Sequence, residues 1–328
     1  MATTTDHLSG HPGHLNEAQQ TALVQFRENL TKDALIPADK DTVVQTLGYD
    51  RFDDQTLLRF LRARKFDLVR AQAMWADNEK WRKEFGADEI AANGFDYPEG
   101  REVTKYYPQF YHKTDREGRP VYIEQLGKLD VNKLYALTNQ DRQLKKLVSE
   151  YELFLKDRLP ASSKESGHLV ETSCTIMDLY NAGISTFYRV KDYVSAASSV
   201  GQNNSRNNGA YVYHQRTLSP IMIAFAYQFP QLYLHLHHPQ PSTVPPSPRS
   251  PVSRQQAPYL FSTVWSLIKP WLDEATVRKI HILGKNYKKE LQEYIPAENL
   301  PASLGGTCNC AGGCEYSNAG PWNPTSQA

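Results

Sequence analysis

The clearest strand pattern in the chain is the stretch 168–179, HLVETSCTIMDL, in which charged residues are few. Such a run is typical of a central strand whose two faces are both covered. Ser173 and Thr175 lie two residues apart, so their hydroxyls point to one face while Cys174 points to the other. The pattern therefore predicts a central strand with two hydroxyls on one apolar face. Hydroxyls that only bond neighbouring strand residues are the alternative.

Helical periodicity dominates the residues before this strand. A helix is expected from Asn16, because apolar residues then recur every three or four positions. Asp53 and Asp67 have the positions of N-caps for two further helices. We therefore predict a small helical module over 15–95, preceded by a disordered tail over 1–14.

Strands and helices alternate after this module, which predicts an α/β domain over 96–306. The expected elements are a β-hairpin with its turn at 115–118 and its second strand at 120–126, a helix from Thr138, the strand at 168–179, helical stretches at 184–198 and from Ser262, and a strand at 281–283 followed by a helix at 286–294.

A low-complexity insert interrupts this domain at 204–256. It is rich in Asn, His and Pro-Ser repeats, a composition that does not readily bury itself. A structureless stretch of this length is unusual inside a compact α/β unit. Our hypothesis is a translated intron or a gene-model error that contributes no convincing strand. Tryptic peptides from this stretch in the native protein would contradict it.

Composition excludes some classes of function. The chain has 328 residues, 40% of them hydrophobic, and a formal net charge of +1, which is typical of an ordinary soluble globular protein. That charge provides no field to attract nucleic acid, and no bound nucleic acid or cofactor is expected. The sequence has no signal-peptide pattern and no run long enough to span a bilayer. We expect a cytoplasmic monomer with reduced cysteines.

Several segments together resemble a known family. They are RFLRARKFD, FYHKTDREGRPVYIE, HLVETSCTIMDL, and the run from APYLFSTVW through IKPWLDEATVRKIHILG to IPAENLP. Over residues 15–203 and 257–306 the chain closely resembles fungal phosphatidylinositol/phosphatidylcholine transfer proteins of the sec-fourteen type, in the CRAL-TRIO lipid-binding family. The resemblance implies a helical amino-terminal module and an α/β domain that holds one phospholipid in an apolar pocket under a helical gate.

A gate is physically required of such a carrier. A two-chain phospholipid carries roughly thirty methylenes, each worth about 0.8 kcal/mol, so free release into water would cost on the order of 25 kcal/mol. The helix from Ser262 is apolar on both sides, which suits a gate, although a plain core helix is the alternative. The expected gate residues are Phe261, Val264, Trp265, Ile268 and Leu272.

The resemblance also implies two head-group sites. The residues that match the phosphatidylcholine site are Tyr111, Tyr122, Tyr151, Ser173 and Thr175, and those that match the phosphatidylinositol site are Arg64, Lys65, Thr276 and Lys279. Hydroxyls can bond a buried phosphate without adding a charge, aromatic faces suit a quaternary ammonium, and basic side chains bind the inositol phosphate. Core tyrosines and a solvated basic face are the alternatives. A family glutamate, within a Tyr-Tyr-Pro-Glu segment, is missing here.

The tail at 307–328 carries Cys308, Cys310 and Cys314. A zinc site would need a fourth donor, and the C-x-C-x3-C spacing matches no paired zinc pattern, so we expect exposed free thiols and no metal.

The expected function is exchange of phosphatidylinositol and phosphatidylcholine between membranes, or presentation of the inositol lipid to phosphoinositide kinases. No catalysis is expected, and the location implied is peripheral on Golgi or endosomal membranes of the secretory pathway. The alternatives are a sterol carrier and an inactive mis-spliced product. A lipid hydrolase that uses Ser173 and His168 is disfavoured, because this spacing on a strand puts the two on opposite faces and no G-x-S-x-G motif is present.

Overall fold

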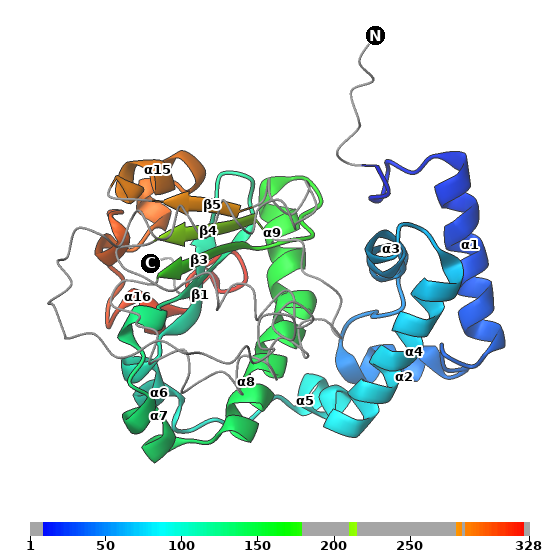
Figure 1. Ribbon diagram of the computed structural model, residues 1–328, viewed down its shortest axis with the longest axis horizontal. Helices are drawn as coiled ribbons and strands as arrows, with labels where there is room; N and C mark the ends of the chain where they lie inside the picture. Colours follow the sequence, from blue (N-terminus) through cyan, green and yellow to red (C-terminus); the bar gives the residue numbers. More distant parts are fainter. Residues whose placement is uncertain (1–8, 179–209, 215–279, 284–285, 325–328) are drawn as a thin grey trace, which may run out of the picture. The chain divides into compact units, whose positions relative to one another are not determined.

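The computed structural model describes residues 9–178, 210–214, 280–283 and 286–324 (Figure 1). These residues divide into two compact units. The first holds residues up to Asp96 together with Lys145–Lys156, and the second holds the other described residues. The helical module therefore reaches beyond the expected 15–95, because it includes part of a long helix that follows in the sequence.

The first unit is helical, as its periodicity predicts. Its helices are α1 (Glu17–Lys32), α2 (Lys40–Leu47), α3 (Asp54–Ala63), α4 (Leu68–Phe85) and α5 (Ala87–Asn93). The short helices α2 and α5 were not predicted. Trp75 lies at the centre of the core, where its ring meets those of Phe26, Phe52 and Phe60 at centroid distances of 4.8 to 6.3 Å. The core thus joins α1, α3 and α4 around one indole.

The structure departs from the expected disordered tail over 1–14 in its last six residues, 9–14, which are ordered. Residues 9–14 form turns, and the carbonyl of the buried Gly10 accepts a hydrogen bond of 3.0 Å from Arg62 Nη1. The ring of Phe66 lies directly under Gly10, about where a Cβ would point. Residues 1–8 lie outside the described residues.

The N-cap of α3 offers a test of how a local sequence signal stabilises this unit. Asp53 Oδ1 accepts a 2.7 Å hydrogen bond from the backbone N–H of Thr56. We expect Asp53→Ala to lower the free energy of unfolding by about 1 kcal/mol, because one helix donor loses its partner. Asp39→Ala is the matched control, since the Asp39 side chain precedes α2 without a capping hydrogen bond. Urea unfolding followed by tryptophan fluorescence would measure both, and equal effects would contradict the expectation.

The second unit is built on one five-stranded sheet in the order β1 to β5 (Figure 1). The strands are β1 (Gln109–Thr114), β2 (Pro120–Glu124), β3 (Cys174–Asp178), β4 (Ala210–His214) and β5 (Ile280–Leu283). β1 and β2 pair antiparallel and the other neighbours pair parallel. The α/β prediction is therefore confirmed, as is the hairpin. Its turn forms because Asp115 Oδ1 accepts the N–H groups of Glu117 and Arg119, each at 2.9 Å.

The remaining elements connect and cover the strands. Before β1 and between β2 and β3 lie α6 (Gly100–Tyr106), η1 (Leu126–Lys128), α7 (Val131–Leu137), α8 (Gln140–Leu153), the short π-helix η2 (Phe154–Arg158) and α9 (Leu159–Ser166). After β5 come α15 (Tyr287–Tyr294), η4 (Ala297–Asn299), η5 (Ala302–Leu304) and α16 (Cys314–Ser317). The expected helices at 184–198 and from Ser262 lie outside the described residues.

One face of the sheet packs on the carboxyl-terminal elements. Its buried core residues are Val121, Ile123, Cys174, Ile176 and Leu283 from the strands, and Tyr287, Leu291, Ile295, Leu300 and Leu304 from the segment after β5. Alternation along the strands then turns Tyr122 and Thr175 to the opposite face. The two hydroxyl-bearing positions thus lie away from this apolar layer.

Two strand predictions are wrong. The central strand is Cys174–Asp178 and not 168–179, because His168 and Leu169 are exposed and the N–H of Val170 bonds Ser163 Oγ at 2.9 Å. The stretch 204–256 does supply a strand, since β4 lies between β3 and β5. This strand has only five residues, AYVYH, and follows an Asn-rich run, so the sequence gives little strand signal there. Pairing with strands on both sides is what selects the extended conformation. The intron or gene-model hypothesis for 204–256 stays a prediction.

Candidate functional site

Three of the predicted phosphatidylcholine residues form a row across the sheet. Tyr111 of β1 pairs with Tyr122 of β2, which pairs with Thr175 of β3. Directly paired residues point to the same face. The two tyrosine rings lie 5.0 Å apart at an interplanar angle of 49°. Tyr111 and Thr175 are buried, and Tyr122 is half-buried. The row therefore offers aromatic faces and hydroxyls side by side in a largely dry setting.

Two residues that sequence reasoning missed complete this row. The guanidinium carbon of Arg158 lies 4.2 Å from the centre of the Tyr111 ring, and Arg158 is only 5% exposed. The indole of Trp322 meets Tyr111 edge to face, with centroids 6.4 Å apart, and lies 5.9 Å from the same guanidinium. A buried arginine over an aromatic face is a cation–π contact. Within the long helical pattern Arg158 looks like any solvent-facing arginine, so no sequence signal marked it.

Buried polar groups flank the row at both ends of the parallel strands β2 and β3. Ser173, one residue before β3, is buried. Glu124, at the end of β2, is also buried, and its carboxylate accepts hydrogen bonds from the Tyr107 hydroxyl and, at 3.2 Å, from the amide of Gln109. Burial raises the pKa of Glu124 above its ordinary value, although the two hydrogen bonds oppose that shift. The face of the sheet that carries the row of Tyr111, Tyr122 and Thr175 therefore also has buried polar side chains.

The other described candidates belong to the first unit. Tyr151 lies on α8 and is half-buried. Arg64 follows α3 as its C-cap and is half-buried, with Nη1 3.2 Å from the carbonyl of Ala63. Lys65 is exposed and has a left-handed backbone, with φ of 52°. The basic pair thus occupies the tight turn between α3 and α4.

The remaining candidates lie outside the described residues. They are Thr276 and Lys279 of the inositol-lipid site and the gate residues Phe261, Val264, Trp265, Ile268 and Leu272. Their roles stay predictions.

The geometry offers no support for a hydrolase pair of His168 and Ser173. The His168 side chain is exposed, and its ring nitrogens contact the carbonyls of Ser166 and Glu117, each at 3.2 Å. Ser173 is buried. His168 and Ser173 do not alternate along one strand, because β3 begins only at Cys174.

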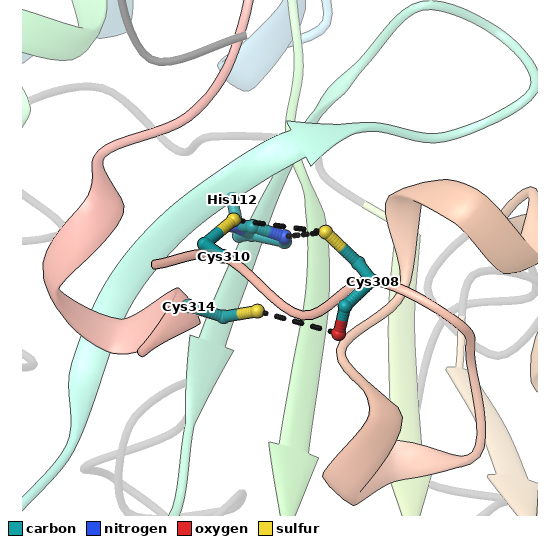
Figure 2. A group of neighbouring side chains, drawn as sticks. All are labelled: His112, Cys308, Cys310 and Cys314. Atoms are coloured by element: carbon teal, nitrogen blue, oxygen red, sulfur yellow. Dashed lines mark hydrogen bonds between the residues drawn. The ribbon is translucent and has the colours of Figure 1, made fainter. Parts of the chain in front are cut away.

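The expectation of exposed thiols in the tail is wrong. Cys308 and Cys314 are buried and Cys310 is half-buried, and all three sulfurs gather with His112 of β1 (Figure 2). Burial, together with the charge of Lys113, lowers the pKa of His112 to about 4, so the imidazole is neutral at pH 7. Burial raises the pKa of the Cys314 thiol to about 12. The tail is therefore a folded part of the second unit.

Two family models match the chain. The CRAL/TRIO N-terminal domain matches residues 22–77, and the CRAL/TRIO domain matches residues 255–306. Among solved structures, the crystal structure of Sfh5 is similar in fold, with a TM-score of 0.51, 14% identity, and coverage of 85% of this chain and 84% of that one. Among the described helices, none is both long enough and apolar enough to cross a bilayer.

Relatives match over nearly the whole chain. The Sec14 cytosolic factor of Schizosaccharomyces pombe is 46% identical over 315 residues, covering 96% of this chain and 91% of that protein. The SEC14 cytosolic factor of Kluyveromyces lactis is 43% identical, with 96% and 88% covered. The phosphatidylinositol/phosphatidylcholine transfer protein SFH4 of Arabidopsis thaliana is 34% identical, with 94% of this chain and 43% of that protein covered. The chain therefore belongs to the CRAL-TRIO family, among its Sec14-type proteins.

Proposed function

We propose that this chain binds one molecule of phosphatidylinositol or phosphatidylcholine and exchanges it between membranes. The single observation that carries the proposal is the similarity of this chain to Sec14 factors over most of their length. The S. pombe factor is 46% identical with 91% of it covered, and the K. lactis factor is 43% identical with 88% of it covered. Two related plant proteins are named as phosphatidylinositol/phosphatidylcholine transfer proteins. The row of Tyr111, Tyr122 and Thr175 supports the same proposal.

The phosphatidylcholine head group would meet this row. A hydroxyl such as that of Thr175 can donate to a phosphate oxygen in a buried setting where a free charge would be costly. The quaternary ammonium needs an aromatic face. Arg158 already covers one face of the Tyr111 ring at 4.2 Å, so we expect the half-buried Tyr122 to be the more accessible ring. Ser173 and Tyr151 are proposed as further contacts.

The inositol lipid would use the basic residues. Arg64 and Lys65 at the end of α3 are proposed to hold its phosphate, together with Thr276 and Lys279. Arginine offers a planar fork to phosphate and lysine a compact charge. The two head-group sites use different residues, so the chain could accept either lipid, and we propose that it binds a single molecule at a time.

Release is proposed to occur only at a membrane surface. The cost of exposing two acyl chains to water requires a cover in solution, and the predicted gate from Phe261 to Leu272 is the segment proposed for it. The chain would act in the cytosol and dock transiently on Golgi or endosomal membranes, where the bound inositol lipid could be presented to a phosphoinositide kinase. No bond is made or broken in this cycle.

Native mass spectrometry of the purified chain after exposure to mixed liposomes tests the proposal. We expect one phosphatidylcholine or one phosphatidylinositol per chain, and transfer of both lipids from donor to acceptor vesicles. An empty, folded chain would contradict the proposal.

The same experiment separates the alternatives. Sterol in the vesicles should not displace the phospholipid, and loading by sterol instead would favour a sterol carrier. Sustained release of fatty acid from phosphatidylcholine would favour a hydrolase. A version that replaces 204–256 by the shorter family segment shows the effect of that stretch, since loading by this version alone would assign the function to a differently spliced chain.

A further inference from the structure

Four side chains that can bind a metal meet in the second unit, outside the head-group sites. They are His112 on β1 and Cys308, Cys310 and Cys314 in the carboxyl-terminal segment, and their ligand atoms all lie within 4.8 Å of one another. Figure 2 shows the three sulfurs and the imidazole pointing toward one another. His112 is 0% exposed, and no carboxylate belongs to the group. Three thiols and one imidazole are the donor set of a structural zinc site.

The spacing of the donor atoms fits a metal more closely than a disulfide. A tetrahedral zinc with Zn–S of about 2.3 Å and Zn–N of about 2.05 Å holds two sulfurs about 3.8 Å apart and a sulfur and a nitrogen about 3.6 Å apart. The Sγ atoms of Cys308 and Cys310 lie 3.7 Å apart, and His112 Nε2 lies 3.4 Å from Cys308 Sγ. A disulfide needs about 2.05 Å. The donor atoms lie within 4.8 Å of one another, so the longest donor–donor distance would need to shorten by only about 1 Å to reach the value in a zinc site.

A hydrogen-bonding neighbour lies at the imidazole nitrogen that faces away from the sulfurs. Ser317 Oγ donates to the carbonyl of Cys314 at 2.9 Å and lies 3.3 Å from His112 Nδ1. Because the hydroxyl proton is used on that carbonyl, its oxygen is left to accept the Nδ1–H. The lone pair of the neutral ring is then on Nε2, which faces the sulfurs. A hydrogen bond that selects the ligand nitrogen is the usual support of a zinc-bound histidine.

Backbone structure places the three cysteines independently of their side chains. The N–H of Cys308 bonds the carbonyl of Leu300 at 3.1 Å, and Gly306 lies so close to that carbonyl that a Cβ would come within 1.9 Å of its oxygen. Gly313, with φ of 106°, donates to the carbonyl of Cys310 at 3.0 Å and turns the chain into α16, where Cys314 is the first residue. The site is therefore preorganised by turns that only glycine accommodates readily.

The second segment of the site is an irregular part of β1. Pairing between β1 and β2 shifts register between Tyr111 and Thr114, and Lys113 has a left-handed φ of 51°. The N–H of Lys113 bonds the carbonyl of Ala319, at 2.6 Å, and not β2. Such a bulge re-aims a side chain, here His112 toward the cysteines.

From this geometry we propose that His112, Cys308, Cys310 and Cys314 bind one zinc ion that has a structural role. Four protein ligands leave no open position for a substrate, so the site is closed and not catalytic. It joins the carboxyl-terminal segment to β1, the edge strand of the described sheet. The same segment carries Trp322 against Tyr111, next to His112 in the strand. The zinc therefore holds in place the segment that covers both the sheet edge and one end of the tyrosine row.

Elemental analysis of the full chain, purified without a histidine tag under reducing conditions, tests the proposal. We expect one zinc per chain, and a fall in the melting temperature when a chelator removes it. Replacement by Co²⁺ should give the ligand-field bands of a tetrahedral site and thiolate-to-cobalt charge transfer. Cys314→Ser and His112→Gln should each lose at least nine tenths of the bound zinc. Cys174→Ala is the matched control, because this buried thiol of β3 is outside the cluster and should leave the zinc content at one.

Two results would overturn the zinc proposal. A reduced wild-type chain that neither contains zinc nor binds added Co²⁺ overturns the proposal, and this measurement does not depend on whether the variants fold. Equal zinc in the wild type, Cys314→Ser and His112→Gln also overturns it, since the metal would then bind elsewhere. Zinc content is measured without lipid, so failure of lipid transfer alone leaves this result unaffected.

Discussion

Glu152→Ala is expected to lower the free energy of unfolding of the helical unit by about 3–5 kcal/mol, because it leaves a buried arginine without its main counter-charge. Arg82 on α4 is 5% exposed and Glu152 on α8 is 2% exposed. Their side chains form two parallel hydrogen bonds of 2.8 and 3.1 Å. The hydroxyl of Tyr49 donates to the same carboxylate at 2.6 Å. The remaining partner of Arg82 is Asp88, whose side chain is 43% exposed.

Thermal and urea unfolding of matched variants measure this loss. Glu84→Ala is the control, since Glu84 pairs with Lys80 on the same helix α4 at 3.9 Å and its side chain is 66% exposed. A surface pair of that kind contributes about 0–1 kcal/mol. Glu152→Gln should lie between the two, because the amide keeps one acceptor but loses the charge. A loss below about 1 kcal/mol for Glu152→Ala would show that Arg82 finds water or another partner.

The pair also explains why residues 145–156 belong to the first unit. Burial and the neighbouring acids act in opposite directions on Arg82, and the attraction of Glu152 prevails, so the pKa of Arg82 is raised and the guanidinium stays charged. Burial is the main cause that raises the pKa of Tyr49, which therefore remains a hydrogen-bond donor. Arg82, Glu152 and Tyr49 thus satisfy one another in a largely buried site, and this fixes α8 against α4.

The double variant Ser173→Ala/Thr175→Val is expected to reduce phosphatidylcholine loading and transfer about a hundredfold while phosphatidylinositol transfer changes little. Each hydroxyl is proposed to donate to the charged phosphate, and a hydrogen bond to a charged group is worth about 1.5–3 kcal/mol. Two of them lost amount to ~3 kcal/mol or more, and 1.4 kcal/mol is a factor of ten. Both residues are buried, so water does not readily replace the lost donors.

Competition between the two lipids in one assay is the sharpest measurement. Thr172→Val is the matched control, since Thr172 adjoins Ser173 but is only half-buried and is not among the proposed contacts. Equal losses of both lipids would point to damage of the whole pocket, and a melting temperature for each variant would detect it. Unchanged phosphatidylcholine transfer would remove Ser173 and Thr175 from the site.

The amino-acid sequence alone determined the elements whose signals are local. Asp53 and Asp67 marked the starts of α3 and α4 as N-caps, and each accepts the expected hydrogen bond from the first turn. Periodicity marked the start of α1 at Asn16, which the structure shows to be a cap as well. Asp115 and Gly118 marked the hairpin turn. Caps and tight turns are made by residues two to four positions apart, so their physics is contained in a short window of sequence. The alternation of strand and helix patterns then indicated the α/β domain, and the family resemblance implied the same.

Only the tertiary structure decided the features that depend on partners far away in the chain. AYVYH becomes β4 because β3 and β5 pair with it on both sides. Arg158 is buried because Tyr111 and Trp322 surround it. The clearest case is the tail, where C-x-C-x3-C shows three donors and the fourth, His112, is 196 residues away from Cys308. Periodicity and spacing indicate which residues share a face of one element. Packing decides which elements then meet. The proposed zinc site forms only when β1 and the carboxyl-terminal segment pack together.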